Sequence, residues 1–176
     1  MLDLIIRNGK CYIDGELKEI DVAIKDKKIH QIGQISEETK ETIDASGHTV
    51  LPGCIDTQTH FREPGSTDTE DLHSGSRAAI AGGITSVFEM PNTNPPTSNK
   101  KEFQRKLDLA KNRMYCNYAF YFGATADNAD DLASLKDLEG CCGIKLFAGS
   151  STGNLLVAEE DDIDKVFQNA SKVVAV

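Results

Sequence analysis

The chain has 176 residues, of which 39% are hydrophobic and 27% are charged, which is enough for one sizeable core or for a small domain beside part of a larger one. Its formal net charge of -9 gives an acidic surface that repels phosphate backbones, so we expect no nucleic-acid partner. No apolar run approaches the roughly 20 residues of a membrane span, and the short apolar start does not fit a signal peptide, so we expect no membrane association.

Cysteine usage indicates a reducing compartment. The number of cysteines is odd, two of them are adjacent, and no Cys-x-x-Cys spacing occurs among Cys11, Cys54, Cys116, Cys141 and Cys142. Adjacent cysteines rarely form structural disulfides, and no spacing supports a cysteine metal site or nucleophile. We therefore expect reduced, mostly buried thiols in a cytoplasmic protein.

Residues 1–50 are predicted to form a β-rich domain. Short extended segments alternate with turn pairs such as Asn8-Gly9 and Asp14-Gly15. Close, regular spacing of short strands is typical of a small sandwich or an open sheet, and we interpret the segment as a partial β-sandwich. His30 and His48 are interpreted as surface residues rather than ligands, so no catalytic group is predicted here.

After Leu51 the pattern changes to apolar strands that alternate with amphipathic helices, which is typical of a parallel sheet. The pattern predicts four β-α units and one further strand. The predicted strands are 53–60, 84–90, 117–123, 143–147 and 172–176. The first predicted helix is 70–81, with Leu72, Ser76, Ala79 and Ile80 on one inner face. The others are one opening at Asn99 with Glu102 in a capping box, one capped by Asp127, and 159–170. The Gly/Ser segment 149–153 is expected to be a plain surface loop.

The first of these strands carries an unusual polar face. In the stretch 51–65, LPGCIDTQTHFREPG, alternation places Asp56, Gln58, His60 and Arg62 on one side of the strand. Four polar groups on one face are costly to bury, so the strand either faces solvent or carries a site. An edge strand with a polar outer face is the simpler alternative.

Other polar groups fall at strand ends, where parallel α/β proteins gather their functional residues. Glu89 and Asn92 fall at the end of the second strand, and Lys145 lies inside the apolar run GIKLF. Burial lowers the pKa of a lysine and leaves a neutral amine that can react with carbon dioxide, giving a carbamate able to bridge two metals. The alternative is a lysine that pairs with a carboxylate or reaches the rim of the sheet.

The stretch 51–65 resembles the Asp-x-His-x-His metal signature of the amidohydrolase superfamily, in the extended form Asp-x-His-x-His-x-Arg-x-Pro-Gly seen in dihydroorotases. The resemblance extends to SGSRAAIAGGITSVFEMPNTNPP and GIKLF, and it covers the whole chain as the first two-fifths of a dihydroorotase. It implies an incomplete TIM-type (β/α)8 barrel of about four β-α units plus a fifth strand. The β-rich domain would span 1–50, and the N-terminal half of the barrel 51–176.

The resemblance also implies roles for individual residues. His60 would be a zinc ligand, and Lys145, N-carboxylated, would bridge two zinc ions. Arg62 and Asn92 would bind the substrate carboxylate. Gln58 stands where the signature has its first histidine and would be a weak ligand. The resemblance implies one or two zinc ions in the complete enzyme, and Gln58 predicts that one metal binds weakly or is missing here. The implied reaction is reversible hydrolysis of dihydroorotate to N-carbamoyl-aspartate in pyrimidine biosynthesis.

The resemblance leaves two further expectations about the chain. Two histidine ligands and the catalytic aspartate of the family fall beyond Val176, so no catalytic residue is assigned here and the isolated chain is expected to be inactive. A partial barrel has unpaired strand edges, so self-association or pairing with a chain carrying the rest of the barrel is expected.

Two other functions stay open. Gln58 suits a non-catalytic dihydroorotase-like subunit that serves as a scaffold for aspartate carbamoyltransferase. A hydantoinase-like or allantoinase-like enzyme is the second alternative, and it is disfavoured by Arg62 and Asn92, because those families typically lack this pair.

Overall fold

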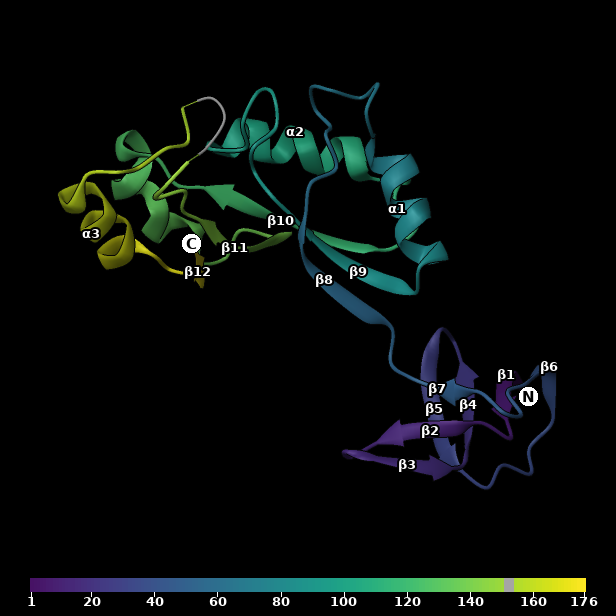
Figure 1. The fold of residues 1–176 in the computed structure, drawn as a ribbon. Helices are drawn as coiled ribbons and strands as arrows, with labels where there is room; N and C mark the ends of the chain where they lie inside the picture. The colour runs from purple at the N-terminus through teal and green to yellow at the C-terminus, as the bar shows by residue number, and fades with distance from the viewer. Residues whose placement is uncertain (151–153) are drawn as a thin grey trace. The chain divides into compact units, whose positions relative to one another are not determined.

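The protein is described from a computed structural model that defines residues 1–150 and 154–176 (Figure 1). Residues 151–153 of the surface loop expected at 149–153 lie outside this description. The chain divides into two compact units, Met1–Pro52 and Gly53–Val176, which are described separately below.

The first unit contains only β-structure, in two sheets. A four-stranded sheet has the order β5-β4-β1-β6 and is formed by β1 (Leu2–Arg7), β4 (Asp21–Lys25), β5 (Lys28–Gly33) and β6 (Thr39–Asp44). A three-stranded sheet has the order β3-β2-β7 and is formed by β2 (Lys10–Ile13), β3 (Glu16–Glu19) and β7 (Thr49–Val50). The prediction of a β-rich N-terminal region is confirmed. Its small core consists of Leu2, Ile5, Ala23 and Ile35.

The second unit is built on one parallel five-stranded sheet with the order β12-β11-β10-β9-β8. The strands are β8 (Cys54–Thr59), β9 (Ile84–Glu89), β10 (Asn117–Gly123), β11 (Cys141–Lys145) and β12 (Val174–Ala175). Neighbours in the sheet are neighbours in sequence, as in the wall of a (β/α)8 barrel. The predicted fold class, a partial barrel with helices between its strands, is therefore confirmed.

Four helical elements connect these strands: α1 (Leu72–Ala81), α2 (Lys100–Ala110), the 3-10 helix η1 (Ala126–Leu135) and α3 (Glu160–Asn169). Asn99 caps α2 by accepting a hydrogen bond from the backbone N–H of Glu102, as predicted, but the return bond to the Glu102 side chain that would complete the predicted capping box is absent from the described residues. The third helix differs from the prediction, because Thr125 rather than Asp127 caps it and its turns are 3-10. Aspartate and asparagine compete for backbone hydrogen bonds, so this Asp-rich segment is a weak α-helix former. No helix in the described part of the chain is both long and apolar enough to cross a membrane.

The core of the second unit lies between the sheet and its helices. Phe103 of α2 is fully buried, with its ring centroid 6.4 Å from that of Phe120 and 6.2 Å from that of Phe122 on β10. Ile80, expected on the inner face of α1, is exposed instead, because α1 buries the small residues Gly75 and Ser76. Strand β11 begins two residues before its predicted start, since cysteine packs as a small apolar residue.

Candidate functional site

The candidate site lies where β8 and β9 end. The two loops that follow these strands are joined by backbone hydrogen bonds, from Met90 N to the carbonyl of Thr59 and from Asn94 N to the carbonyl of Pro64, both 2.9 Å. In parallel sheets the carboxyl ends of neighbouring strands share one edge, and functional groups gather there. The backbone thus holds the His60 loop and the Asn92 loop side by side.

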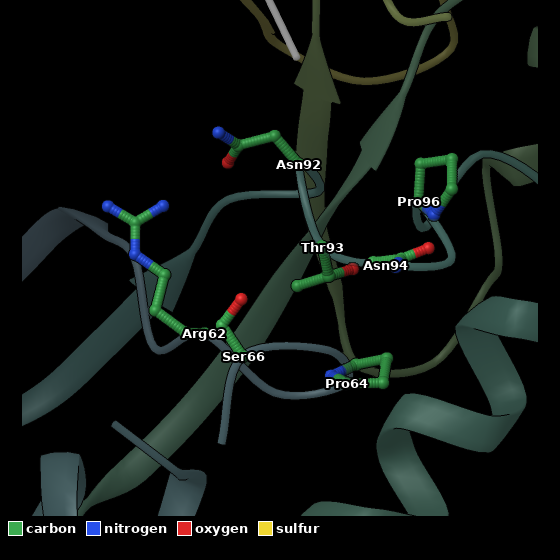
Figure 2. Close-up of a pocket in the computed structure, with 7 residues that line it drawn as sticks. All are labelled: Arg62, Pro64, Ser66, Asn92, Thr93, Asn94 and Pro96. Atoms are coloured by element: carbon green, nitrogen blue, oxygen red, sulfur yellow. The ribbon is translucent and has the colours of Figure 1, made fainter. Parts of the chain in front are cut away.

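These loops enclose a cavity of about 330 Å³ (Figure 2). The cavity is lined by Arg62, Pro64, Ser66, Asn92, Thr93, Asn94 and Pro96. Arg62 is exposed, and none of the ion pairs within the described ranges 1–150 and 154–176 involves its guanidinium. A planar guanidinium and a carboxamide that face one cavity are suited to a carboxylate, since both can donate N–H groups to its oxygens.

A hydrogen bond fixes the orientation of both His60 and Asn92. His60 Nδ1 lies 2.9 Å from Asn92 Oδ1. An amide oxygen only accepts, so the proton lies on Nδ1, and the lone pair of a neutral His60 is left on Nε2. The same bond leaves the Nδ2 donors of Asn92 available. His60 is thereby prepared to bind a metal through Nε2, as metal-binding histidines usually are when their other nitrogen donates to the protein.

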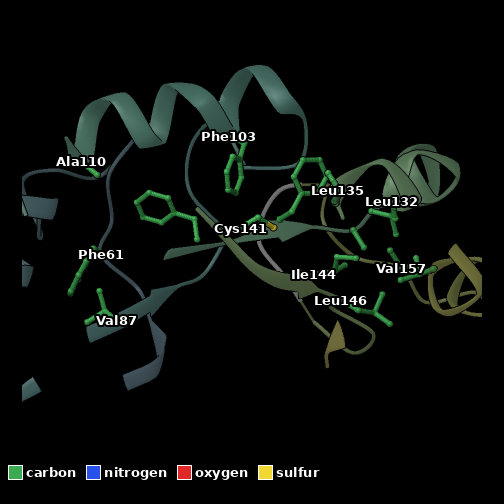
Figure 3. Close-up of a cluster of buried hydrophobic side chains, with 14 of the residues drawn as sticks. Phe61, Val87, Phe103, Ala110, Leu132, Leu135, Cys141, Ile144, Leu146 and Val157 are labelled. Carbon is green, nitrogen blue, oxygen red and sulfur yellow. The ribbon is translucent and has the colours of Figure 1, made fainter. Parts of the chain in front are cut away.

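Phe61 anchors the segment that carries His60 and Arg62. Its side chain is buried at one end of the core that also holds Val87 and Phe103 (Figure 3). Helix α1 passes so close to this ring that a Cβ atom on Gly75 would lie 2.5 Å from Phe61 Cδ1. The glycine is therefore required for the helix to approach, and the contact fixes the strand end that carries His60 and Arg62.

Glu63 is a second anchor, and the sequence analysis did not single it out. Its carboxylate is buried, accepts a 2.9 Å hydrogen bond from Leu72 N at the start of α1, and is held by both terminal nitrogens of Arg113 at 2.7 and 3.1 Å. The neighbouring Glu63 carboxylate raises the pKa of Arg113. A charged residue in a motif gives no sign of burial, and its partner is 50 residues away.

A buried ion pair supports the second loop. Glu89, the last residue of β9, pairs with Lys106 of α2, and both side chains are fully buried. Lys106 also donates a 3.0 Å hydrogen bond to the carbonyl of Met90, two residues before Asn92. Burial raises the pKa of Glu89 to about 7, against the opposing effects of Lys106 and Arg62, and burial lowers the pKa of Lys106. Glu89 falls at the end of its strand, as predicted, but no local pattern indicates that Lys106 is its partner.

Lys145 lies at the end of β11, where it is 9% exposed and its Nζ is 4.9 Å from the ring centroid of Phe147. Burial lowers its pKa, the environment that carbamate formation needs. In the order of the sheet, β10 and β9 lie between β11 and β8. The structure joins His60 to Asn92 by a hydrogen bond and places Arg62 and Asn92 on one cavity, whereas His60, Gln58 and Lys145 do not line that cavity.

The residues that could hold a metal form an incomplete set. His60 suits one ligand position, and a carboxylated Lys145 would suit another, but Gln58 is exposed and offers only a neutral amide oxygen. Residues 1–150 and 154–176 contain no cluster of three His, Cys, Asp or Glu residues able to hold a metal ion. A catalytic zinc site usually has at least three protein ligands, so the described residues do not complete one.

Comparison with known proteins shows the family. The amidohydrolase family model matches residues 49–174, and the chain belongs to that family. It is 40% identical over 149 residues to an allantoinase of Escherichia coli O1:K1 / APEC, covering 84% of this chain and 33% of the relative. It is 37% identical over 163 residues to a dihydroorotase of Methanosarcina mazei, covering 92% of this chain and 36% of the relative.

Solved structures of similar fold were also found. An L-hydantoinase (dihydropyrimidinase) from Arthrobacter aurescens superposes with a TM-score of 0.89 and 28% identity, over 99% of this chain and 40% of the hydantoinase. The chain spans about a third of the length of the curated relatives it matches. The resemblance to amidohydrolases is thus confirmed, and relatives with three different substrate names share it.

Proposed function

We propose that this chain forms part of a dihydroorotase-like site that hydrolyses dihydroorotate reversibly to N-carbamoyl-aspartate, as in cytoplasmic pyrimidine biosynthesis. Residues 51–176 would supply the barrel portion and 1–50 the β-rich domain. The observation that carries the proposal is that Arg62 and Asn92 line one cavity at the ends of β8 and β9. Dihydroorotate carries a carboxylate on its ring, and this pair offers the N–H donors that a carboxylate needs.

Each proposed residue has a defined task. Arg62 binds the substrate carboxylate, Asn92 donates to it through Nδ2, and His60 offers Nε2 to a zinc ion. Carboxylated Lys145 would offer anionic oxygens to the metal, with Gln58 as a weak neutral donor. Zinc, when bound, would lower the pKa of water and polarise the amide carbonyl. Since the described ligands are too few for a complete site, we expect the 176-residue chain to bind dihydroorotate without hydrolysing it.

Calorimetric titration tests the carboxylate assignment. Dihydroorotate should bind more tightly than hydantoin, a related ring without a carboxylate, and Arg62→Ala should remove that preference. Hydrogen bonds to charged groups contribute about 1.5–3 kcal/mol, so we expect a loss of at least about tenfold in dihydroorotate affinity. Arg77→Ala, which removes an exposed arginine of α1, is the matched control and should bind as the unmodified chain does. Equal affinity of the unmodified chain for both rings would refute the assignment.

An allantoinase-like or hydantoinase-like function is the second candidate. The 40% identity to an allantoinase and the superposition on a hydantoinase favour it. In that case the ring would lack a carboxylate, and Arg62 would contribute little to binding. Allantoin that binds more tightly than dihydroorotate, with no effect of Arg62→Ala, would support this candidate.

A non-catalytic subunit that supports aspartate carbamoyltransferase is the third candidate, and exposed Gln58 in the metal signature favours it. Co-sedimentation with aspartate carbamoyltransferase, without bound zinc, would support it. Strands β8 and β12 each pair on one side only within the described sheet, so we also propose association with a second chain or copy. A sedimentation profile that stays monomeric at high concentration would contradict that association.

A further inference from the structure

The segment that carries Arg62 is held in place by the residues on either side of Arg62. Phe61 and Glu63 are 6% and 7% exposed, whereas Arg62 between them is exposed and lines the cavity. Two buried neighbours leave the backbone at Arg62 little freedom, so the direction in which its side chain leaves the loop depends on them. Phe61 is fixed by packing, and Glu63 is fixed by charge.

The anchor at Glu63 is a fork formed by Arg113. The two terminal nitrogens of Arg113 donate to the two carboxylate oxygens, at 2.7 and 3.1 Å, and the Leu72 backbone N–H adds a third donor. Paired parallel hydrogen bonds of this kind fix the plane of the carboxylate as well as its position. The start of a helix also favours a negative charge, which adds to the same preference.

Arg113 is in turn fixed by the helices on either side. Its Nη1 donates to the carbonyl of Leu109 at 3.1 Å, and its Nη2 lies 3.7 Å from Asp71, the residue that caps α1. Its own backbone N–H donates to the carbonyl of Ala110, the last residue of α2. Arg113 therefore connects the end of α2, the start of α1 and the loop after β8, although it does not line the cavity.

The Glu63 side chain is 9% exposed and that of Arg113 is 36% exposed, so the ion pair is only partly buried. Such a pair adds little stability, because desolvation of the carboxylate offsets much of the attraction. An apolar residue at position 63 would bury the loop with less desolvation. What the fork provides instead is one defined geometry, since a guanidinium matches a carboxylate in one plane.

We infer that Arg113 is a positioning residue for carboxylate recognition: through Glu63 it holds Arg62 in the orientation that distinguishes a ring bearing a carboxylate from an uncharged ring. This inference rests on the proposed function, because it assigns Arg62 to the substrate carboxylate. It adds a residue outside the cavity to the set that determines specificity.

Three variants test the inference. Arg113→Lys keeps the charge and loses the fork, and Arg113→Gln loses both. Since Arg113→Gln leaves Glu63 buried without a cation, the double variant Glu63→Gln/Arg113→Gln provides a neutral pair that can fold if the single variant does not. Arg105→Gln is the matched control, because Arg105 is an exposed arginine of α2, the helix that ends at Ala110 shortly before Arg113, and it pairs with Glu102 at 3.3 Å rather than with Glu63.

Two measurements are made on the 176-residue chain: hydrogen exchange over residues 61–72 without ligand, and calorimetric affinity for dihydroorotate and hydantoin. We expect faster exchange over 61–72 in the Arg113 variants and not in Arg105→Gln. We expect dihydroorotate affinity to fall about tenfold or more in Arg113→Lys, since small misplacements of a binding group have large effects, while hydantoin affinity changes by less than about twofold.

The outcomes separate this inference from the proposed function. Unchanged exchange over 61–72 in folded Arg113 variants would overturn the inference whatever the ligand data show. An equal loss for both rings would also overturn it, because it would indicate a structural role only. An unmodified chain that does not prefer dihydroorotate to hydantoin would overturn the proposed function, whereas normal preference that persists in Arg113→Lys would overturn the inference alone.

Discussion

The 2.9 Å hydrogen bond between His60 Nδ1 and Asn92 Oδ1 couples the proposed metal ligand to the proposed substrate ligand. The side-chain amide of Asn92 contributes to both: its Oδ1 orients His60, and its Nδ2 remains a hydrogen-bond donor for the substrate. Changes at position 92 should therefore affect zinc and substrate in separable ways.

Replacing Asn92 tests this coupling. Asn92→Asp keeps an oxygen acceptor for His60 but replaces the donor end with a negative oxygen, so zinc affinity should be retained and dihydroorotate binding lost. Asn92→Ala removes both ends, and loss of a group that orients a metal ligand typically costs about 10–100-fold in metal affinity. Zinc titration and calorimetry on the two variants measure the effects. Equal zinc affinity in both variants would show that the hydrogen bond does not orient His60.

Gln58→His should strengthen zinc binding. Imidazole nitrogen is a better zinc ligand than a neutral amide oxygen, and position 58 is exposed on the strand that leads to His60. We expect an increase of roughly tenfold in zinc affinity, equivalent to about 1.4 kcal/mol, measured by competition with a chromogenic chelator. Gln104→His, at an exposed position of α2, is the control for a new surface histidine. A similar increase in the control would refute a specific site.

The Glu89–Lys106 pair should show strong coupling in a double-mutant cycle. Lys106→Met leaves a carboxylate buried without its cation and should lower the free energy of unfolding by about 3–5 kcal/mol. Glu89→Met/Lys106→Met leaves no buried charge and should recover most of that loss. Urea denaturation measures each variant. Losses that simply add would mean that the two side chains do not interact as the structure indicates.

Glu89 should also make stability depend on pH. Burial raises its pKa from the ordinary 4.5 to about 7, so the folded protein binds this proton more tightly than the unfolded chain does. The contribution is fully present below about pH 4.5 and is lost as pH rises through about 7, with a total of at most about 3 kcal/mol. Glu89→Gln should flatten the curve of unfolding free energy against pH in this window. Glu139→Gln, at an exposed position, should leave the slope as it is.

The parts of this fold that follow from sequence are those set by local signals. The apolar runs that became β9 and β10, and the cap at Asn99, depend on residues within a few positions of one another, so their spacing suffices. The exposed Ile80 and the cap of η1 departed from expectation. The first depends on what packs against α1, and the second depends on which of two capping residues, Thr125 or Asp127, the folded backbone selects. Pattern alone does not contain that information.

The proposed site also has residues that local sequence identifies and residues that only the folded chain identifies. His60, Arg62 and Asn92 stand in contiguous motifs at strand ends, so a parallel sheet brings them to one edge. The pairs Glu63–Arg113 and Glu89–Lys106 are separated by 50 and 17 residues, and 19 basic side chains could serve as partners, so only the folded chain identifies them. Lys145 stands out in the sequence by its apolar surroundings, but only the folded chain shows that β9 and β10 lie between its strand and β8.

Gly75 shows how a residue without any functional group can control the geometry of the proposed site. Even one methyl group there would press on the Phe61 ring and displace the imidazole and the guanidinium on either side of it. A saturation screen for ligand capture should therefore rank this helical glycine with the ligand-contacting positions, and a compensating smaller side chain at 61 should be the commonest suppressor.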